Sequence, residues 1–240
     1  MRYALEINRK DAEKYINDSI LILPLGSLEQ HGPHLPLGTD SYTAEEISVR
    51  VASKIDNSVI LPLLPYGYAW VWKDIPLTIS LREKTLKELI KDIAFSVYRF
   101  KPRALLVING HLANESALKY AARDIADEIP LKLFYFSLPE IDKFPMDSKP
   151  SELTIHAEEI ETSLMLTIRP ELVNMKSAFA EYPKKPKSYG CSALSLGSLS
   201  KSGVFGDPSV ATKEKGELYM KIMVNYIIEV LKDENIIQGG

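Results

Sequence analysis

Residues 20–40 have the sequence ILILPLGSLEQHGPHLPLGTD, and this stretch indicates both the fold class and the place of a functional site. Its first part, ILILPL, is continuously apolar, which is typical of a strand that a parallel sheet buries on both faces. The following loop is rich in Gly and Pro, and its ionisable side chains are Glu29, His31, His34 and Asp40. Because α/β proteins bind ligands beyond the carboxyl ends of their strands, this loop is a candidate site.

The rest of the chain continues the alternation of apolar runs and amphipathic segments. The apolar runs predict strands at residues 19–25, 59–64, 104–108 and 131–136. The amphipathic segments predict helices at residues 42–55, 83–100, 115–128 and 157–168, and a last helix at about 212–232. Strands and helices that alternate at this spacing imply right-handed βαβ crossovers, and therefore a doubly wound α/β fold.

The bulk composition is that of an ordinary globular protein. The chain has 240 residues, of which 45% are hydrophobic and 25% charged, and we expect a single domain over residues 1–240. Residues 140–153 and 180–205 are rich in Pro, Ser, Lys and Gly, so we expect long loops there. Loops of that length in a compact domain are usually functional or lie at a subunit contact.

Charge and hydropathy exclude several classes of partner. A formal net charge of −3 gives no basic field for nucleic acid, and no apolar run is long enough to span a bilayer. The N-terminal residues are too polar for a signal peptide, so we expect a cytoplasmic protein. The single cysteine, Cys191, excludes an internal disulfide framework and a thiolate metal cluster.

All four histidines fall in three segments that also carry polar or acidic side chains. In the first segment Glu29 and His31 are two residues apart, so in an extended chain they project to the same side. Asp40, at the start of a predicted helix, can close this group from the other end of the loop. The second segment, INGHLAN at residues 108–114, places His111 at the carboxyl end of another buried strand, on the same edge of a parallel sheet.

The third segment is HAEEIETSLML, residues 156–166. On a helix His156 and Glu159 share one face, whereas Glu161 points elsewhere. Nitrogen and oxygen ligands without sulfur indicate a divalent ion such as Zn, Mn or Fe. Glu29, Asp40 and a third carboxylate such as Glu159 suit two such ions better than one, with Asp40 as the bridging ligand.

Four motifs resemble those of the creatininase family of amidohydrolases. LPLGSLEQHGPHLPLGTD (residues 23–40) is close to the first signature of the family. INGHLAN stands where the family usually has NGHGGN, and HAEEIETS (residues 156–163) stands where it has HAGEIETS. GVFGDPSVATKEKG (residues 203–216) resembles the last block. The motifs occur in the same order and span nearly the whole chain.

The resemblance implies a three-layer αβα sandwich with a mostly parallel sheet, a homo-oligomer that is usually hexameric, and a binuclear metal centre. By motif match, the metal ligands are Glu29, His31, Asp40 and His111, with Asp40 bridging two divalent ions. For the third carboxylate we favour Glu159, with Glu161 as the alternative. His156 matches a residue proposed to transfer a proton to the leaving nitrogen.

The implied activity is hydrolysis of a C–N amide bond in a small molecule by a metal-activated water. Creatinine is one candidate substrate, but Ala113 stands where creatininase itself has a glutamate. A formamide on a formamidopyrimidine nucleotide is equally compatible, and a peptide is a third candidate. Trp70 and Trp72 belong either to the substrate pocket or to the core or a subunit contact. The alternative from another class is a catalytically inactive protein that kept the metal site.

Overall fold

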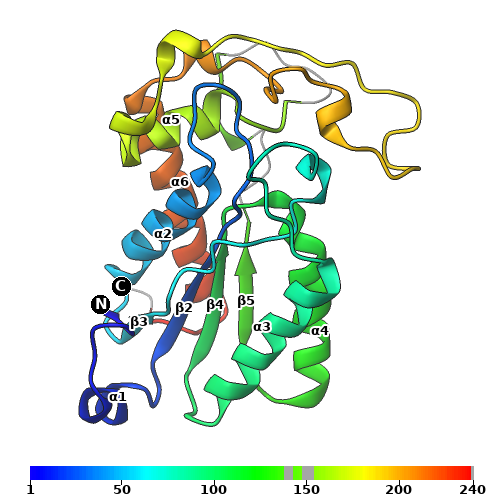
Figure 1. Ribbon diagram of the computed structural model, residues 1–240. Coiled ribbons are helices and arrows are strands. Elements are labelled where there is room, and N and C mark those ends of the chain that lie inside the picture. Colours follow the sequence, from blue (N-terminus) through cyan, green and yellow to red (C-terminus); the bar gives the residue numbers. More distant parts are fainter. Residues whose placement is uncertain (138–142, 148–153, 239–240) are drawn as a thin grey trace.

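The computed structural model describes residues 1–137, 143–147 and 154–238. Five parallel strands form one sheet in the order β1-β3-β2-β4-β5 (Figure 1). The strands are β1 (Arg2–Tyr3), β2 (Ile20–Leu25), β3 (Ser58–Ile60), β4 (Ala104–Asn109) and β5 (Leu133–Phe136). The helices are α1 (Arg9–Tyr15), α2 (Thr39–Ala52), α3 (Glu83–Tyr98), α4 (Glu115–Glu128), α5 (Glu159–Ile168) and α6 (Lys213–Asp233). Short 3-10 turns lie at Trp70–Trp72, Leu112–Asn114, Pro170–Leu172, Met175–Ser177, Leu196–Ser198 and Pro208–Val210.

The sheet is the middle one of three layers. Apolar residues of α2, α5 and α6 pack on one face of the sheet, and those of α3 and α4 pack on the other (Figure 1). Every residue of β2 and β4 is buried, which explains why both strands are continuously apolar rather than alternating. The predicted αβα sandwich with a parallel sheet is therefore confirmed.

The register of the two central strands determines where the functional loops meet. β2 and β4 pair in parallel from Ile20 opposite Ala104 to Leu25 opposite Asn109. Their carboxyl ends therefore finish level with each other. The loop that begins at Gly26 and the segment that begins at Gly110 consequently leave the sheet side by side, as the parallel arrangement predicts.

The predicted elements differ from the observed ones mainly at their ends. The strand predicted at residues 59–64 is confined to Ser58–Ile60, and the short elements β1 and α1 were not predicted. β1 has two residues and α1 has seven, so neither carries a hydrophobic period that a sequence pattern could reveal. Much of the loop predicted at residues 140–153 lies outside the described residues.

The start of α5 is the difference that matters for function. The helix was predicted from residue 157, but it begins at Glu159, and Ala157 has a φ of +50°. The Glu158 side chain accepts hydrogen bonds from the backbone N–H groups of Ile160 and Glu161, which caps the helix at this point. His156 therefore lies before the helix and has no helical relationship to the residues that follow.

The long segment at residues 180–205 packs partly against the 3-10 turn at Trp70–Trp72. Tyr189, Leu196 and Leu199 contact the cluster formed by Trp72 and Phe205, and Ser195 Oγ donates to the carbonyl of Val71 at 2.8 Å. None of the helices in the described part of the chain has the length and apolar content that a membrane span requires. The single domain over residues 1–240 stays a prediction.

Candidate metal centre

Four of the predicted ligands meet at the carboxyl edge of the sheet, and all four are buried. Glu29 and His31 come from the loop after β2, Asp40 from the first turn of α2, and His111 from the segment directly after β4. A Cβ at Gly110 would collide with the backbone oxygen of Asp40, so glycine is needed for the end of β4 to approach α2.

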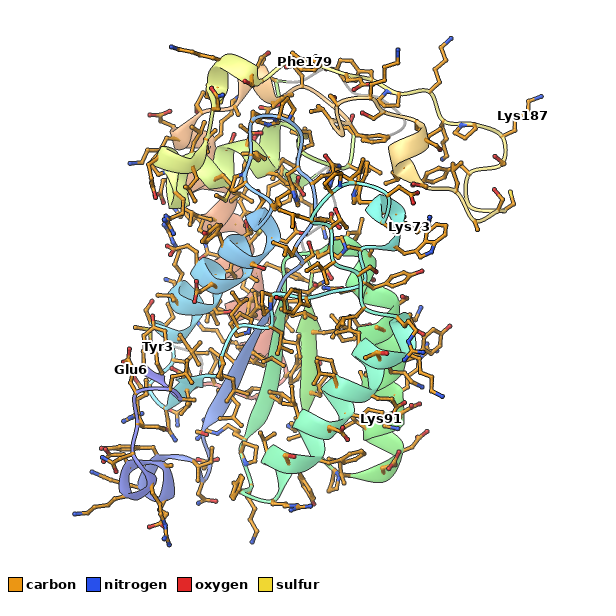
Figure 2. The ribbon with its side chains drawn as sticks, viewed as in Figure 1. Tyr3, Glu6, Lys73, Lys91, Phe179 and Lys187 are labelled. Carbon is orange, nitrogen blue, oxygen red and sulfur yellow. The ribbon has the colours of Figure 1, made fainter. Side chains whose placement is uncertain are left out.

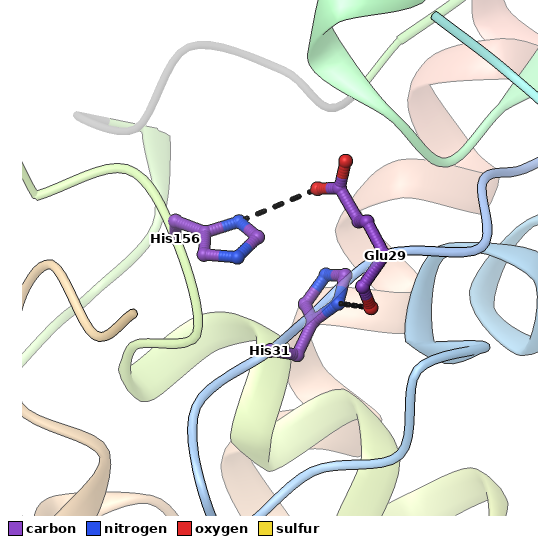
Figure 3. A group of neighbouring side chains, drawn as sticks. All are labelled: Glu29, His31 and His156. Carbon is purple, nitrogen blue, oxygen red and sulfur yellow. Dashed lines mark hydrogen bonds and ion pairs between the residues drawn. The ribbon is translucent and has the colours of Figure 1, made fainter. Parts of the chain in front are cut away.

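The segment before α5 completes the site from the opposite side. Figure 3 shows His156 facing Glu29 and His31; the distance from His156 Nδ1 to Glu29 Oε1 is 3.8 Å. Glu161, in the first turn of α5, reaches His31 Nε2 at 3.8 Å through Oε2. The same oxygen accepts a hydrogen bond from the Ala157 N–H at 2.5 Å, which holds the carboxylate toward the cluster.

The two oxygens of Asp40 face different histidines. Oδ1 is 3.1 Å from His31 Nε2, and Oδ2 is 3.0 Å from His111 Nδ1. Two sets of donor atoms therefore share Asp40, and within each set the atoms lie within 4.8 Å of one another. The first set is Glu29, Asp40 and His111, and the second is His31, Asp40 and Glu161. A third set of comparable spacing consists of Glu29, His31 and His156.

The carboxylate of Glu29 supports the presence of a cation. Glu29 is fully buried, and neither of its oxygens accepts a hydrogen bond within the described residues. In the same part of the chain, no lysine or arginine forms an ion pair with Glu29, Asp40 or Glu161. The nearest charged neighbour of Glu29 among the ion pairs is His111, whose Nδ1 is 3.4 Å from Oε1. A buried carboxylate without a hydrogen-bond donor is costly, and a divalent ion would remove that cost.

The histidines are oriented as metal ligands usually are. His31 Nδ1 is 3.2 Å from the carbonyl oxygen of Glu29, and His111 Nε2 is 3.1 Å from the carbonyl oxygen of Tyr68. Each ring therefore donates one N–H to the backbone and directs its other nitrogen at the carboxylates. Ligating histidines are typically held by such a second hydrogen bond, so these residues fit divalent ions.

The pKa values show how strongly this cluster attracts positive charge. Burial, opposed by His111, raises the pKa of Glu29 to about 8. Burial alone would lower the pKa of His31, but the carboxylates of Asp40 and Glu161 outweigh it and raise that pKa to about 10. The pKa of His111 rises to about 9, because Glu29 and Asp40 likewise outweigh burial. The carboxylates therefore favour positive charge on both of these histidines.

His156 is in a different electrostatic state. Its pKa is lowered well below the usual range, first by burial and then by the charge of His31. Its Nε2 is 2.8 Å from the carbonyl oxygen of Gln30, which can accept a proton, and 3.0 Å from the side-chain amide nitrogen of the same residue, which can donate one. Its Nδ1 faces Glu29. The ring also stacks on Trp72, with the ring centroids 4.7 Å apart. Gln30 was not among the predicted site residues, although its place between Glu29 and His31 could have suggested it.

Glu159 belongs to none of the three donor sets and pairs with Lys215 instead, an arrangement that does not favour its predicted role as the third carboxylate. Its Oε1 is 2.6 Å from Lys215 Nζ, and both of its oxygens accept the backbone N–H of Asp147 at 3.1 Å. The preference for Glu159 over Glu161 assumed a helix that includes His156. Because α5 begins only at Glu159, the alternative, Glu161, is the residue that reaches the histidines.

A pocket of about 710 Å³ opens above the cluster. Its acidic and basic lining includes Glu29, Asp40, His111, His156, Glu158 and Glu161. Its walls include Trp72, Lys143, Phe144, Tyr189, Leu196 and Tyr226. Of the two tryptophans, Trp72 both lines the pocket and is buried, with 1% of its surface exposed. The other wall residues come from distant segments and have no sequence signal in common.

Comparison with known proteins places this chain in a family. The family model for creatininase (creatinine amidohydrolase) matches residues 5–231. The creatinine amidohydrolase of Pseudomonas putida is 28% identical, over 95% of each chain. The mycofactocin precursor peptide peptidase of Mycolicibacterium smegmatis is 31% identical, over 89% of this chain and 84% of the relative.

Solved structures agree with these sequence matches. A creatininase structure described as its Mn form is 26% identical and superimposes with a TM-score of 0.84, over 97% of this chain and 98% of the other. A mutant creatininase of the Zn–Zn type, also 26% identical, gives a TM-score of 0.83 over 97% of each chain. The chain belongs to the creatininase family, whose members are metal-dependent amidohydrolases.

Proposed function

We propose that this chain hydrolyses a C–N amide bond at a binuclear centre in which Asp40 bridges two divalent ions. The proposal rests mainly on Asp40, which belongs to two donor sets: one of its oxygens faces His31 and the other faces His111. Glu29 and His111 would complete one ion site, and His31 and Glu161 the other. Nitrogen and oxygen donors suit Zn, Mn or Fe, and solved relatives described as Mn and Zn–Zn forms support this choice.

Bound divalent ions would supply an acidified water and a polarised substrate carbonyl, as they do in other hydrolases. The protein itself contributes the proton transfer. His156 is neutral at pH 7, and with its proton on Nε2 the lone pair of Nδ1 faces Glu29 and the pocket. It can therefore accept a proton from the attacking water and deliver it to the leaving nitrogen, which would otherwise depart as an unfavourable anion. In this tautomer the ring donates its Nε2 proton to the carbonyl oxygen of Gln30.

The pocket supports two classes of substrate. Creatinine or a formamide, the candidates that the motifs favour, are small molecules that fit easily. A pocket of about 710 Å³ is within the range that holds drug-sized ligands, and Ala113, also in its lining, adds no bulk. Because one relative is named a peptide peptidase, cleavage of a short peptide is the second candidate.

Metal analysis and a substrate screen test the proposal together. We expect the purified protein to hold about two divalent ions per chain, as a bridged site requires. Creatinine, formamides and short peptides should be screened before chelation, after chelation and after restoration of Zn, Mn or Fe. Hydrolysis that survives chelation would contradict the mechanism. Full metal content without any C–N hydrolysis would instead indicate the catalytically inactive alternative.

The hexameric homo-oligomer and the cytoplasmic location stay predictions. Large apolar side chains on the surface are compatible with subunit contacts. Leu77 is 71% exposed and Leu112 is 59% exposed. Light scattering coupled to gel filtration would measure the mass of the particle and so test the hexamer directly.

A further inference from the structure

The side of α5 that faces away from the metal centre carries a second buried carboxylate with a different set of partners. The Glu159 side chain is fully buried and forms an ion pair of 2.6 Å with Lys215 Nζ on α6. The same ammonium group is 2.8 Å from Asp147 Oδ2 and donates to the carbonyl of Val210 at 2.7 Å. The pair thus joins α5, α6 and the segment that contains Asp147.

That segment, residues 143–147, is here called the wall segment. The backbone N–H of Asp147 donates to both oxygens of Glu159 at 3.1 Å. Tyr219 on α6 donates its hydroxyl to the carbonyl of Pro145 at 2.8 Å. Its ring packs edge-on against Phe144, with a centroid distance of 5.2 Å. Glu159, Lys215 and Tyr219 therefore hold the wall segment by side-chain, backbone and aromatic contacts.

The wall segment also forms part of the substrate pocket. Lys143 and Phe144 line the same pocket as Glu29, His111 and His156. Phe144 is 5% exposed and also belongs to the core cluster that contains Tyr219. A displacement of this segment would change the shape of the pocket without moving any residue of the two donor sets that share Asp40.

We propose that Glu159 and Lys215 are positioning residues that fix the wall segment against α5 and α6 and thereby determine substrate affinity. They act through Lys143 and Phe144 rather than on the metal ions. The effect on substrate rests on the proposed hydrolase function, whereas the effect on the wall segment does not. The two can therefore be tested separately.

Lys91 provides a matched control for Lys215. It also lies on a helix between two carboxylates, with its Nζ 3.3 Å from Asp124 Oδ2 and 3.2 Å from Glu128 Oε1. The exposed fractions of the two side chains are similar, at 14% for Lys91 and 19% for Lys215. Lys91 is on α3, on the opposite face of the sheet from α6 (Figures 1 and 2).

The first experiment is independent of catalysis. Limited digestion with trypsin, followed by mass spectrometry, measures cleavage after Lys143 and after Lys187, an exposed residue in another loop (Figure 2). In Lys215→Met and Glu159→Gln, cleavage after Lys143 should accelerate about tenfold or more, because local opening becomes easier. Cleavage after Lys187 should not change, and Lys91→Met should accelerate neither.

The second experiment measures metal content and kinetics on whichever probe of the screen is hydrolysed. Both variants should keep the metal content of the unmodified protein. Their KM should rise about tenfold, the signature of weakened substrate binding, while kcat changes much less. Lys215→Arg, which keeps the charge, should have most of the substrate affinity that Lys215→Met loses. Lys91→Met should leave KM unchanged.

Tyr219→Phe gives a test that keeps the buried ion pair intact. It removes the hydroxyl that donates to the Pro145 carbonyl at 2.8 Å and lies 3.5 Å from Glu159 Oε1, and it leaves Glu159 and Lys215 unchanged. A faster cleavage after Lys143 in this variant, without loss of metal, supports the proposal even if Glu159→Gln does not fold.

Three results would overturn the inference. Unchanged cleavage after Lys143 in Lys215→Met would show that the pair does not hold the wall segment. Loss of metal from Glu159→Gln would make Glu159 a ligand. A fall in kcat with KM unchanged would place the pair in the chemical step. If no probe is hydrolysed, the proposed function fails, but the digestion still decides whether the wall segment is held.

Discussion

The first turn of α5 buries two carboxylates in opposite ways. Glu161 faces a cluster that also contains Glu29 and Asp40, where the only positively charged partners in the described chain are histidines. Glu159, two residues earlier, is matched by the ammonium group of Lys215 and by a backbone N–H. The Glu159 side chain is fully buried and that of Glu161 is 14% exposed, but only Glu159 has a permanent cation from the protein.

The presence or absence of a protein cation separates a structural contact, at Glu159, from a candidate binding site, at Glu161. A buried charge needs a partner, and the Lys215 side of the helix provides one from the chain itself. The cluster around Asp40 does not, and there the carboxylates of Asp40 and Glu161 outweigh burial and raise the pKa of His31 to about 10. A site that binds protons this strongly is suited to a divalent ion. Burial of an acidic side chain is therefore a weaker indicator of a metal ligand than the lack of a lysine or arginine beside it.

The largest effect should come from Asp40→Ala. Because Asp40 would serve both ions, we expect loss of nearly all bound metal and of activity, measured as metal per chain and as hydrolysis rate. Asp124→Ala, which removes a carboxylate from a surface ion pair on α4, is the control and should keep both. Full metal content in Asp40→Ala would show that this carboxylate is not the bridge.

Glu161→Gln and Glu159→Gln compare the two sides of the turn directly. Glu161→Gln should lower the metal content from about two ions per chain to about one, because it removes a charged ligand from one ion only. Activity should fall sharply with it. Glu159→Gln should keep both ions. The reverse pattern would mean that the helix presents its other face to the metals in solution.

His156→Ala separates proton transfer from metal binding. We expect kcat to fall by about 10² to 10⁴, the usual contribution of a general acid or base. Metal content should stay near that of the unmodified protein, because the two donor sets that share Asp40 do not include His156. Metal analysis of the same sample is the control. A parallel loss of metal would make His156 a ligand, through its set with Glu29 and His31.

The smallest effect should come from Ser27→Ala. Ser27 Oγ donates a hydrogen bond of 2.7 Å to Asp40 Oδ2 and so orients the proposed bridging carboxylate. Loss of such a supporting contact typically weakens metal affinity by about 10 to 100-fold, which titration with a chelating dye would measure. Tyr219→Phe, which removes a hydroxyl near Glu159, should leave metal affinity unchanged. An equal loss in both variants would point to a general effect on the fold.

Much of the fold was predictable because the central strands are buried on both faces. The continuous apolar runs of β2 and β4 identified them, and the amphipathic period identified α3 and α4 within two residues at each end. β1 and α1 were missed because elements this short carry no complete period. Their positions depend on pairing with β3 and on contacts that no local pattern contains.

The sequence by itself determined which side chains at the sheet edge could meet. Glu29, His31 and His111 follow buried parallel strands, and the ends of such strands lie together whatever the loops do. Only the tertiary structure gives a reason to prefer Glu161 to Glu159. That choice depends on the N-cap at Glu158, on the left-handed backbone at Ala157, and on Lys215, which lies more than fifty residues away in the sequence. A helical period predicts which residues share a face of the helix. It predicts neither the residue at which the helix begins nor the lysine or arginine that pairs with a carboxylate on that face.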